Sequence, residues 1–169
     1  MATGVVTKKN LWPIIKANLS LAKGSYAAVG FPGDSAKAKQ SHGAKMTNVD
    51  VALANEFGTP PGVKPVVSSR PFMRQTFAGT KRRKFLDAGE QLLGQIAKGQ
   101  MSTKIALERL GAMGATAIKD EITSPSPAFV PNAPYTIAKK KSSHPLIDTG
   151  AMRAAVTHKV RMKSGTGAK

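Results

Sequence analysis

The chain has 169 residues, a length typical of one domain. Its 26 Lys and Arg against 9 Asp and Glu give a formal net charge of +17, which predicts a polyanionic neighbour, either nucleic acid or an acidic protein. The absence of Cys excludes disulfide scaffolds, thiol nucleophiles, Cys zinc sites and iron–sulfur clusters.

The N-terminal region predicts a helix followed by a strand. Apolar residues recur at helical spacing over residues 11–22, and apolar side chains alternate over residues 25–31. Residues 32–45 carry Gly, Ser and Lys with little apolar bulk, so we expect a mobile basic loop there. Residues 1–10 lack the apolar stretch of a signal peptide, and no run of the sequence is apolar enough for a membrane span.

A second helix is predicted to begin after Thr47. Thr47 and Asp50 have the types and spacing of a capping box, and Gly58 is suited to end the helix. The expected apolar face consists of Val49, Leu53 and Phe57. Residues 59–71 contain four Pro and form a connector that cannot be helical, with residues 66–67 as a candidate short edge strand.

Two long helices follow, over residues 72–99 and from Ser102 to Ser124. The first carries the basic run at residues 81–84 on its flank. Because only a short turn joins the two helices, we expect them to pack against each other. The residues expected to fill the core between these helices and the sheet are Leu92, Ile96, Leu107, Leu110 and Ile118.

The C-terminal part is expected to form an arm and a strand. Residues 124–145 contain five Pro, with a short basic helix at 135–141, and this arm should be ordered by an adjacent subunit or by the chain's own helices. Residues 153–161 alternate as a strand, with Ala154, Val156, His158 and Val160 on one face. The opposite face is basic and carries Arg153, Lys159 and Arg161. Residues 162–169 are expected to be a flexible tail.

These patterns predict a single α+β domain over residues 1–161, with a small, mainly antiparallel sheet flanked by the two long helices. Catalytic chemistry has little support. His42, His144 and His158 show no metal-ligand spacing, no nucleophile elbow accompanies His144 and Asp148, and no phosphate-binding loop precedes a helix. We therefore expect no enzyme activity, no metal and no cofactor.

Five segments stand in order over residues 48–161: 54–59 (ANEFGT), 69–74 (SRPFMR), 107–111 (LERLG), 131–143 (PNAPYTIAKKKSS) and 145–153 (PLIDTGAMR). This series resembles the tail-completion and virion-morphogenesis proteins of tailed bacteriophages, which join the tail to the head at the neck. Several residues in it also have plain structural readings, since Gly58 can end a helix, Pro71 and Phe72 can anchor one, and Asp148 or Thr149 can cap a turn. The residues expected to form the structural motif are Phe57, Gly58, Arg70, Pro71, Phe72, Asp148, Thr149 and Gly150.

The resemblance implies a structural virion protein that forms a ring in the neck, as a hexamer or a dodecamer. Its partners would be further copies of itself, the head-side connector, and the tail terminator or tail tube, with DNA in the lumen as a further contact. It would reside in the virion, and in the host cytoplasm during assembly. The residues expected at interfaces with other subunits or neck proteins are Phe129, Tyr135, Ile137, Lys139, Lys140, Lys141, Arg153, Lys159 and Arg161.

The alternative is a basic nucleic-acid-binding protein that contacts the DNA backbone, because the basic clusters could neutralise phosphates. Aromatic residues do not alternate with these clusters, which weakens any role in base stacking. The salt dependence of DNA affinity separates the two hypotheses. A dedicated binder with six or more phosphate contacts should lose on the order of a thousandfold in affinity between low and moderate salt.

Overall fold

The computed structural model describes residues 10–37, 46–64, 66–124 and 127–163. In chain order, the elements are α1 (Trp12–Ala22), β1 (Tyr26–Gly30), α2 (Asp34–Lys37), α3 (Asn48–Phe57), α4 (Phe72–Thr76), α5 (Gly79–Ala97), α6 (Thr103–Thr123), α7 (Pro134–Lys140), α8 (Ala151–Ala155) and β2 (Thr157–Arg161). The two strands pair antiparallel, with Val29 opposite His158. The predicted α+β class, with a small antiparallel sheet and long helices, is confirmed.

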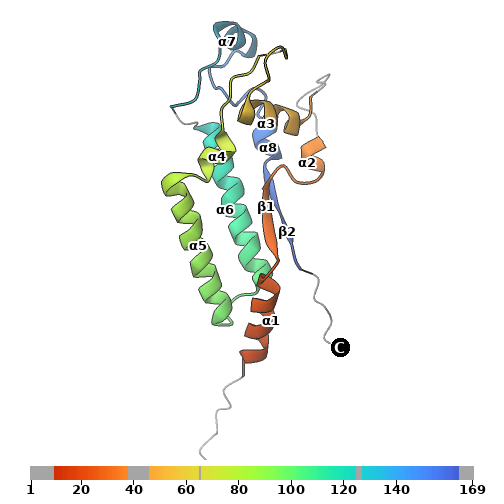
Figure 1. Ribbon diagram of the computed structural model, residues 1–169, viewed down its shortest axis with the longest axis vertical. Helices are drawn as coiled ribbons and strands as arrows, with labels where there is room; N and C mark the ends of the chain where they lie inside the picture. Colours follow the sequence, from red (N-terminus) through yellow and green to blue (C-terminus); the bar gives the residue numbers. More distant parts are fainter. Residues whose placement is uncertain (1–9, 38–45, 65, 125–126, 164–169) are drawn as a thin grey trace, which may run out of the picture.

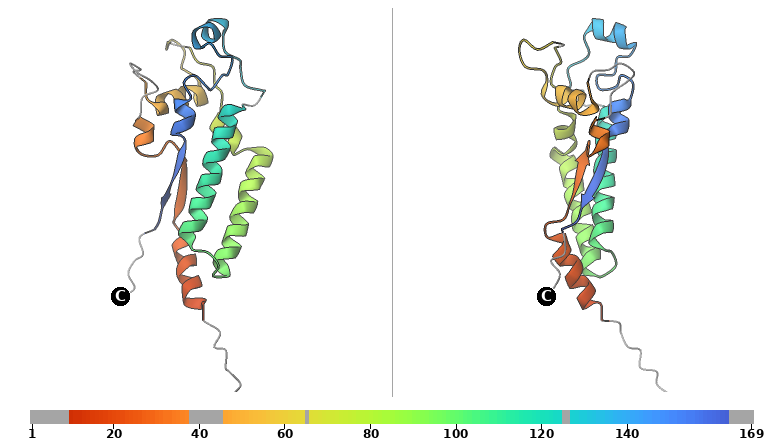
Figure 2. Two further views of the ribbon diagram at one scale, coloured as in Figure 1. Left: turned by 180° about the vertical axis from the view of Figure 1, so that it is seen from behind. Right: turned by 90° about the vertical axis from the view of Figure 1, so that its right-hand side faces the viewer.

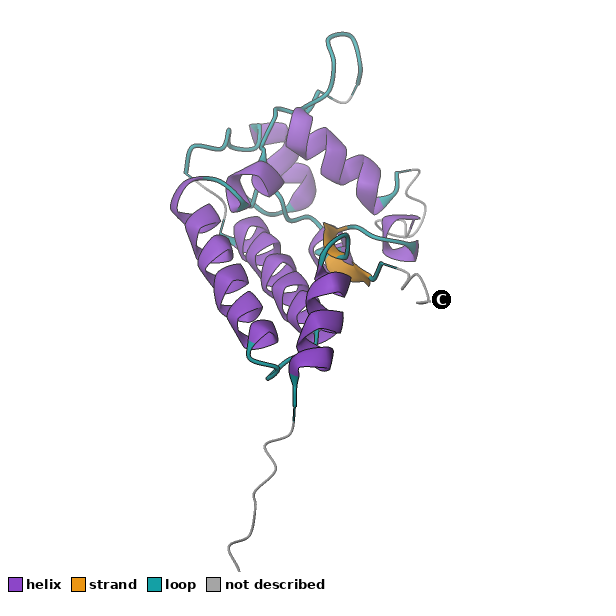
Figure 3. Ribbon diagram, turned by 60° about the horizontal axis from the view of Figure 1, so that its bottom comes forward, coloured by secondary structure: helices purple, strands orange, loops and turns teal. Residues whose placement is uncertain are grey.

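Helix α6 is the central element (Figure 1). The β1–β2 sheet packs against one side of α6, and α5 runs along another side after the short turn that joins the two helices. Helix α1 projects at one end of the molecule, whereas α3, α7 and α8 gather at the other end (Figure 2). Seen with its lower end forward, the molecule has α1 beside the ends of α5 and α6 (Figure 3). We call the end at which α1 projects the α1 end, and the opposite end, where α3, α7 and α8 gather, the α7 end.

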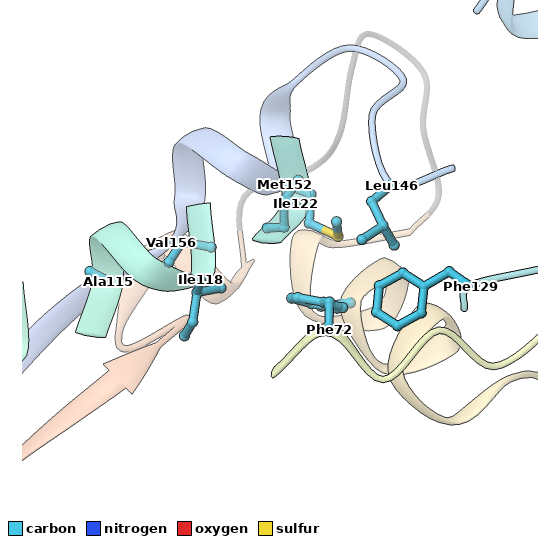
Figure 4. Close-up of a cluster of buried hydrophobic side chains, with 9 residues drawn as sticks. Phe72, Ala115, Ile118, Ile122, Phe129, Leu146, Met152 and Val156 are labelled. Carbon is cyan, nitrogen blue, oxygen red and sulfur yellow. The ribbon is translucent and has the colours of Figure 1, made fainter. Parts of the chain in front are cut away.

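The buried core lies toward the α7 end. Phe72, Ile118, Ile122 and Val156 are all 0% exposed, and further buried side chains from the arm and α8 complete the cluster (Figure 4). Of the five predicted core residues, Ile96 and Ile118 are buried. The prediction is wrong for Leu92, Leu107 and Leu110, which are half-buried because they line open hollows between α1, β1, α5 and α6.

The predicted helix over residues 72–99 is two helices. Phe77 and Ala78 separate α4 from α5, and Gly79 has a φ of 52°, in the left-handed region that favours glycine. The apolar periodicity continues across this break, and the Phe77 and Phe85 rings pack with centroids 5.0 Å apart. The sequence pattern therefore gives no indication of the break between α4 and α5.

The apolar face predicted for α3 forms, since Val49, Leu53 and Phe57 line one hollow with Phe31 and Met73, but it is not the buried face of the helix. Leu53 and Phe57 are exposed, whereas Asn48, Ala52 and Glu56 are buried. Ala52 belongs to the buried core cluster around Phe72. Glu56 is buried because its carboxylate binds the first amides of α4.

Three further expectations need correction. The strand expected over residues 153–161 begins only at Thr157, because the Ala-rich residues Ala151–Ala155 form α8. Residues 66–67 form no strand, and their chain is an irregular loop. Asp34–Lys37, inside the expected basic loop, form α2. The remainder of that loop, residues 38–45, and the end of the expected tail, residues 164–169, lie outside the described residues.

The predicted capping box at the start of α3 is confirmed. The Thr47 hydroxyl accepts from the Asp50 amide at 3.2 Å, and the Asp50 carboxylate accepts from the Thr47 amide at 2.8 Å. Hydrogen bonds from the Thr47 side chain and then its amide lower the pKa of Asp50. A depressed carboxyl pKa means that this contribution to stability is present at neutral pH and is lost as the pH falls below about 4.

Replacing Thr47 with Ala should therefore lower the free energy of unfolding by about 1 kcal/mol at pH 7. Urea unfolding followed by circular dichroism measures the loss. The difference between Thr47→Ala and the wild type should shrink as the pH is lowered through the Asp50 transition. A difference that stays constant from pH 7 to pH 3 would contradict the contribution of the hydrogen bond from the Thr47 hydroxyl to the Asp50 carboxylate.

Candidate assembly surfaces

Arg70 joins three distant parts of the chain at the α7 end. It is 6% exposed, and its Nε donates to the carbonyl of Val130 at 2.8 Å. Its Nη2 donates to the Pro131 carbonyl at 3.3 Å and to Asn132 Oδ1 at 3.2 Å, while Nη1 donates to Asn55 Oδ1 at 3.4 Å. Burial lowers the pKa of Arg70, but a guanidinium remains charged at neutral pH. We call this group of contacts the Arg70 clamp.

Glu56 forms a second link beside the clamp. Its carboxylate accepts from the amides of Met73 and Arg74 at 2.9 and 3.1 Å and from Nε of Arg74 at 3.0 Å. The Arg74 guanidinium also lies over the ring of Phe57, 5.1 Å from its centroid. Glu56 thereby satisfies free amides at the start of α4 and fixes α3 against it.

The arm is held by the chain itself. Phe129 is buried in the core beside Phe72 and Leu146 (Figure 4), so little of its side chain is available to another subunit. Asn132 Nδ2 and Lys140 Nζ both donate to the His144 carbonyl, at 3.1 and 3.2 Å. Desolvation, and to a smaller extent the charge of Arg70, lowers the pKa of Lys140, while Asp148 opposes this shift.

The predicted arm helix is confirmed as α7, and it presents several of the expected interface residues. Tyr135 is 77% exposed, and Ile137, Lys139 and Lys141 are also exposed. Lys141 ends the helix in the left-handed conformation, with a φ of 53°. The α7 end thus carries an exposed aromatic ring beside several positive charges.

The basic face predicted for the last strand is partly confirmed. Thr157, Lys159 and Arg161 of β2 are exposed, while His158 and Val160 are half-buried and face α6. Lys159 and Arg161 pair across the sheet with Ala28 and Tyr26, so no acidic side chain lies opposite them on β1. Arg153 is exposed on α8 instead of the strand, where its Nε donates to the Thr123 hydroxyl at 2.7 Å.

Three other expected motif residues occupy turns: Thr149 and Gly150 lie in the turn before α8, and Gly58 lies at the end of α3. Gly150 precedes α8 with a φ of 80°, and the Thr149 hydroxyl accepts from the Ala151 amide at 3.3 Å. The Thr149 hydroxyl therefore holds the turn before α8, whose N-cap is Gly150, and α8 then leads into β2. Gly58 ends α3 with a φ of 78°, and a Cβ there would lie 3.1 Å from backbone atoms of the following connector.

Large hydrophobic side chains are exposed more often than they are buried in the described residues. Trp12, Phe57, Val66 and Tyr135 are the most exposed of them. An apolar groove of roughly 590 Å³ also opens between β1 and α5, with Leu107, Leu110 and Gly114 of α6 among its lining residues. The apolar groove is therefore a candidate surface for binding another protein, whereas singly exposed apolar side chains are common on monomers.

Most of the candidate metal-ligating and catalytic side chains can be located among the described residues. No group of three or more His, Asp and Glu side chains among them could hold a metal ion. His158 is 2.8 Å from Glu108, and His144 is exposed on a loop, while His42 lies outside the described residues. None of the helices described here has the length and apolar character needed to cross a membrane.

Comparisons with models of known protein families, with curated proteins and with solved structures find no match. The sequence reasoning missed Glu56, Asn132 and the apolar groove. Asn132 and Glu56 do lie inside the segments that carry the resemblance, which was the available signal for them.

Proposed function

We propose that the chain is a structural virion protein of a tailed bacteriophage, which forms a ring in the neck, completes the tail and joins it to the head. One observation carries most of the weight. Four of the segments that carry the phage resemblance lie far apart in the sequence, yet the Arg70 clamp, Glu56 and the core around Phe72 connect them at the α7 end. A series of segments that folds into one connected unit is a stronger basis for a resemblance than isolated motifs.

The exposed apolar residues support an assembly role over a catalytic one. A ring needs each subunit to present two different surfaces that fit each other. The apolar groove and the exposed residues of α1 and α7 supply such surfaces at separate places. The assembly is a homo-oligomeric ring, hexameric or dodecameric, that contacts the head-side connector and the tail terminator or tail tube in the virion.

The basic face of β2 would meet a polyanion in this setting. Unpaired cations are costly to bury, so Lys159 and Arg161 need solvent, acidic groups or phosphate around them. Acidic surfaces of neighbouring neck proteins suit this role better than lumen DNA, because strong phosphate contacts would slow the passage of DNA. If the chain were instead a free DNA-binding protein, its affinity for DNA would fall steeply with salt.

The double variant Lys159→Glu with Arg161→Glu should stay folded and abolish the joining of heads to tails, because it reverses two exposed charges on one face. Complementation of a phage that lacks this chain measures joining as infectious titre. The matched control, Lys84→Glu with Lys104→Glu, makes the same charge change at exposed positions on α5 and α6. Wild-type titre from the β2 variant would remove this role of the basic face.

A further inference from the structure

Helix α1 is attached to the rest of the chain along one narrow strip. The Thr103 hydroxyl donates to the Asn18 carbonyl at 2.6 Å, and the side chains of Leu11 and Ile15 lie beside Gly99. No residue of α1 is buried, although the helix is rich in apolar side chains. An amphipathic helix is normally stabilised by the apolar face that it covers, so most of this face lacks a partner within the described chain.

The uncovered face of α1 carries a regular pattern. Trp12, Lys16 and Leu19 lie at positions i, i+4 and i+7, which places them on one side of a helix. Trp12 is 64% exposed, Leu19 is 40% exposed, and Lys16 is exposed without an ion pair among the described residues. We call these three residues the α1 stripe.

Helix α5 carries the same pattern with the opposite charge. Leu86, Glu90 and Leu93 also lie at i, i+4 and i+7, and we call them the α5 stripe. Leu86 and Leu93 are 48% and 51% exposed, and they border the two apolar hollows that share Leu107 and Leu110. Glu90 is exposed and has no ion pair within the part of the chain that the structure describes.

We propose that the α1 stripe of one copy packs against the α5 stripe of a second copy. Both stripes are exposed in the same chain, so they do not cover each other there. In each stripe a charged residue lies between two apolar residues. This residue is the positive Lys16 in the α1 stripe and the negative Glu90 in the α5 stripe. Lys16 and Glu90 therefore meet at the centre of the contact whether the helices run parallel or antiparallel, with apolar pairs on either side.

This contact rests on the proposed ring and specifies which surfaces build it. The two stripes are different patches, so a copy that uses its α1 stripe on one neighbour keeps its α5 stripe for another. Such head-to-tail contacts close into a ring when the rotation between neighbours allows it. The apolar pairs would supply most of the affinity, and the Lys16–Glu90 pair would supply register and selectivity.

The experiment reverses each charge separately in the full chain. Lys16→Glu and Glu90→Lys should each weaken self-association by roughly tenfold or more, because like charges then face each other at the contact. An equimolar mixture of the two variants should assemble again, because the reversed pair has opposite charges. Lys104→Glu, an exposed change outside both stripes, is the control and should assemble like the wild type.

Two readouts separate the outcomes. Sedimentation velocity gives the size of the assembly, and Trp12, the only Trp of the chain, should shift its fluorescence to the blue as its ring is buried. The inference is overturned if the wild type stays monomeric, if either single variant assembles like the wild type, if the mixture does not recover, or if assembly leaves the Trp12 emission unchanged.

Different experimental outcomes would exclude the proposed contact and the proposed neck function. Rings that form without a Trp12 shift, from a chain that still restores head-to-tail joining, would exclude the contact and leave the neck function standing. Stripe-dependent rings from a chain whose loss leaves joining intact would support the contact and exclude the neck function.

Discussion

Replacing Arg70 with Met should lower the free energy of unfolding by roughly 2–4 kcal/mol, because several acceptors lose a charged donor at once. The affected acceptors belong to Asn55, Val130, Pro131 and Asn132, so the arm should loosen together with the end of α3. Urea unfolding gives the total loss, and hydrogen exchange of the residues around Asn132 should increase.

The control for this change is Arg83→Met, which removes an exposed Arg paired with Asp87 at 2.9 Å. That pair lies on the surface and should contribute well under about 1 kcal/mol. Arg70→Lys should recover only part of the stability, because one ammonium cannot reach acceptors on both sides of the clamp. If Arg70→Met lowers the free energy of unfolding no more than Arg83→Met does, the Arg70 clamp does not stabilise the fold as described.

Replacing Gly111 with Ala should destabilise the fold by roughly 1–3 kcal/mol, although Ala favours helices. A Cβ at this position would lie 2.6 Å from Cδ2 of His158 and 2.9 Å from its Cγ. The imidazole cannot move aside freely, because its Nε2 is 2.8 Å from a Glu108 carboxylate oxygen. Strand β2 would therefore have to shift away from α6.

Gly94→Ala is the matched control, since Gly94 is also within a long helix and its added Cβ would meet nothing within 4 Å. It should stabilise the chain by up to about 1 kcal/mol through helix propensity alone. Thermal unfolding of the two variants measures the contrast. If Gly111→Ala were as stabilising as Gly94→Ala, the sheet would not pack on α6 as described.

The features that could be predicted from sequence are those determined by neighbouring residues. Two helix caps form as expected, because in each the two partners lie within one turn. These caps are Thr47 with Asp50, and Ser102 with the amide of Ile105. The break at Gly79 was missed because the apolar pattern continues through it. The burial of Glu56 was also missed, since its partners on α4 are 17 and 18 residues away.

In the candidate surfaces too, features set by neighbouring residues could be predicted and contacts between residues distant in the sequence could not. The exposure of Lys159 and Arg161 follows from strand alternation, which is a local property. Arg153 was misassigned because an Ala-rich segment that could alternate as a strand forms α8 instead. The Arg70 clamp joins residues about 60 positions apart, and sequence spacing carries no signal for such a contact.

We propose that the chain joins heads to tails, and electron microscopy of lysates tests this proposal most directly. Under this proposal, a tailed phage that encodes the chain is grown with an early stop codon in this reading frame. We predict that DNA-filled heads and complete tails then accumulate separately, and that adding the purified chain joins them into infectious particles. Normally joined virions in the usual yield, without the chain, would contradict the account.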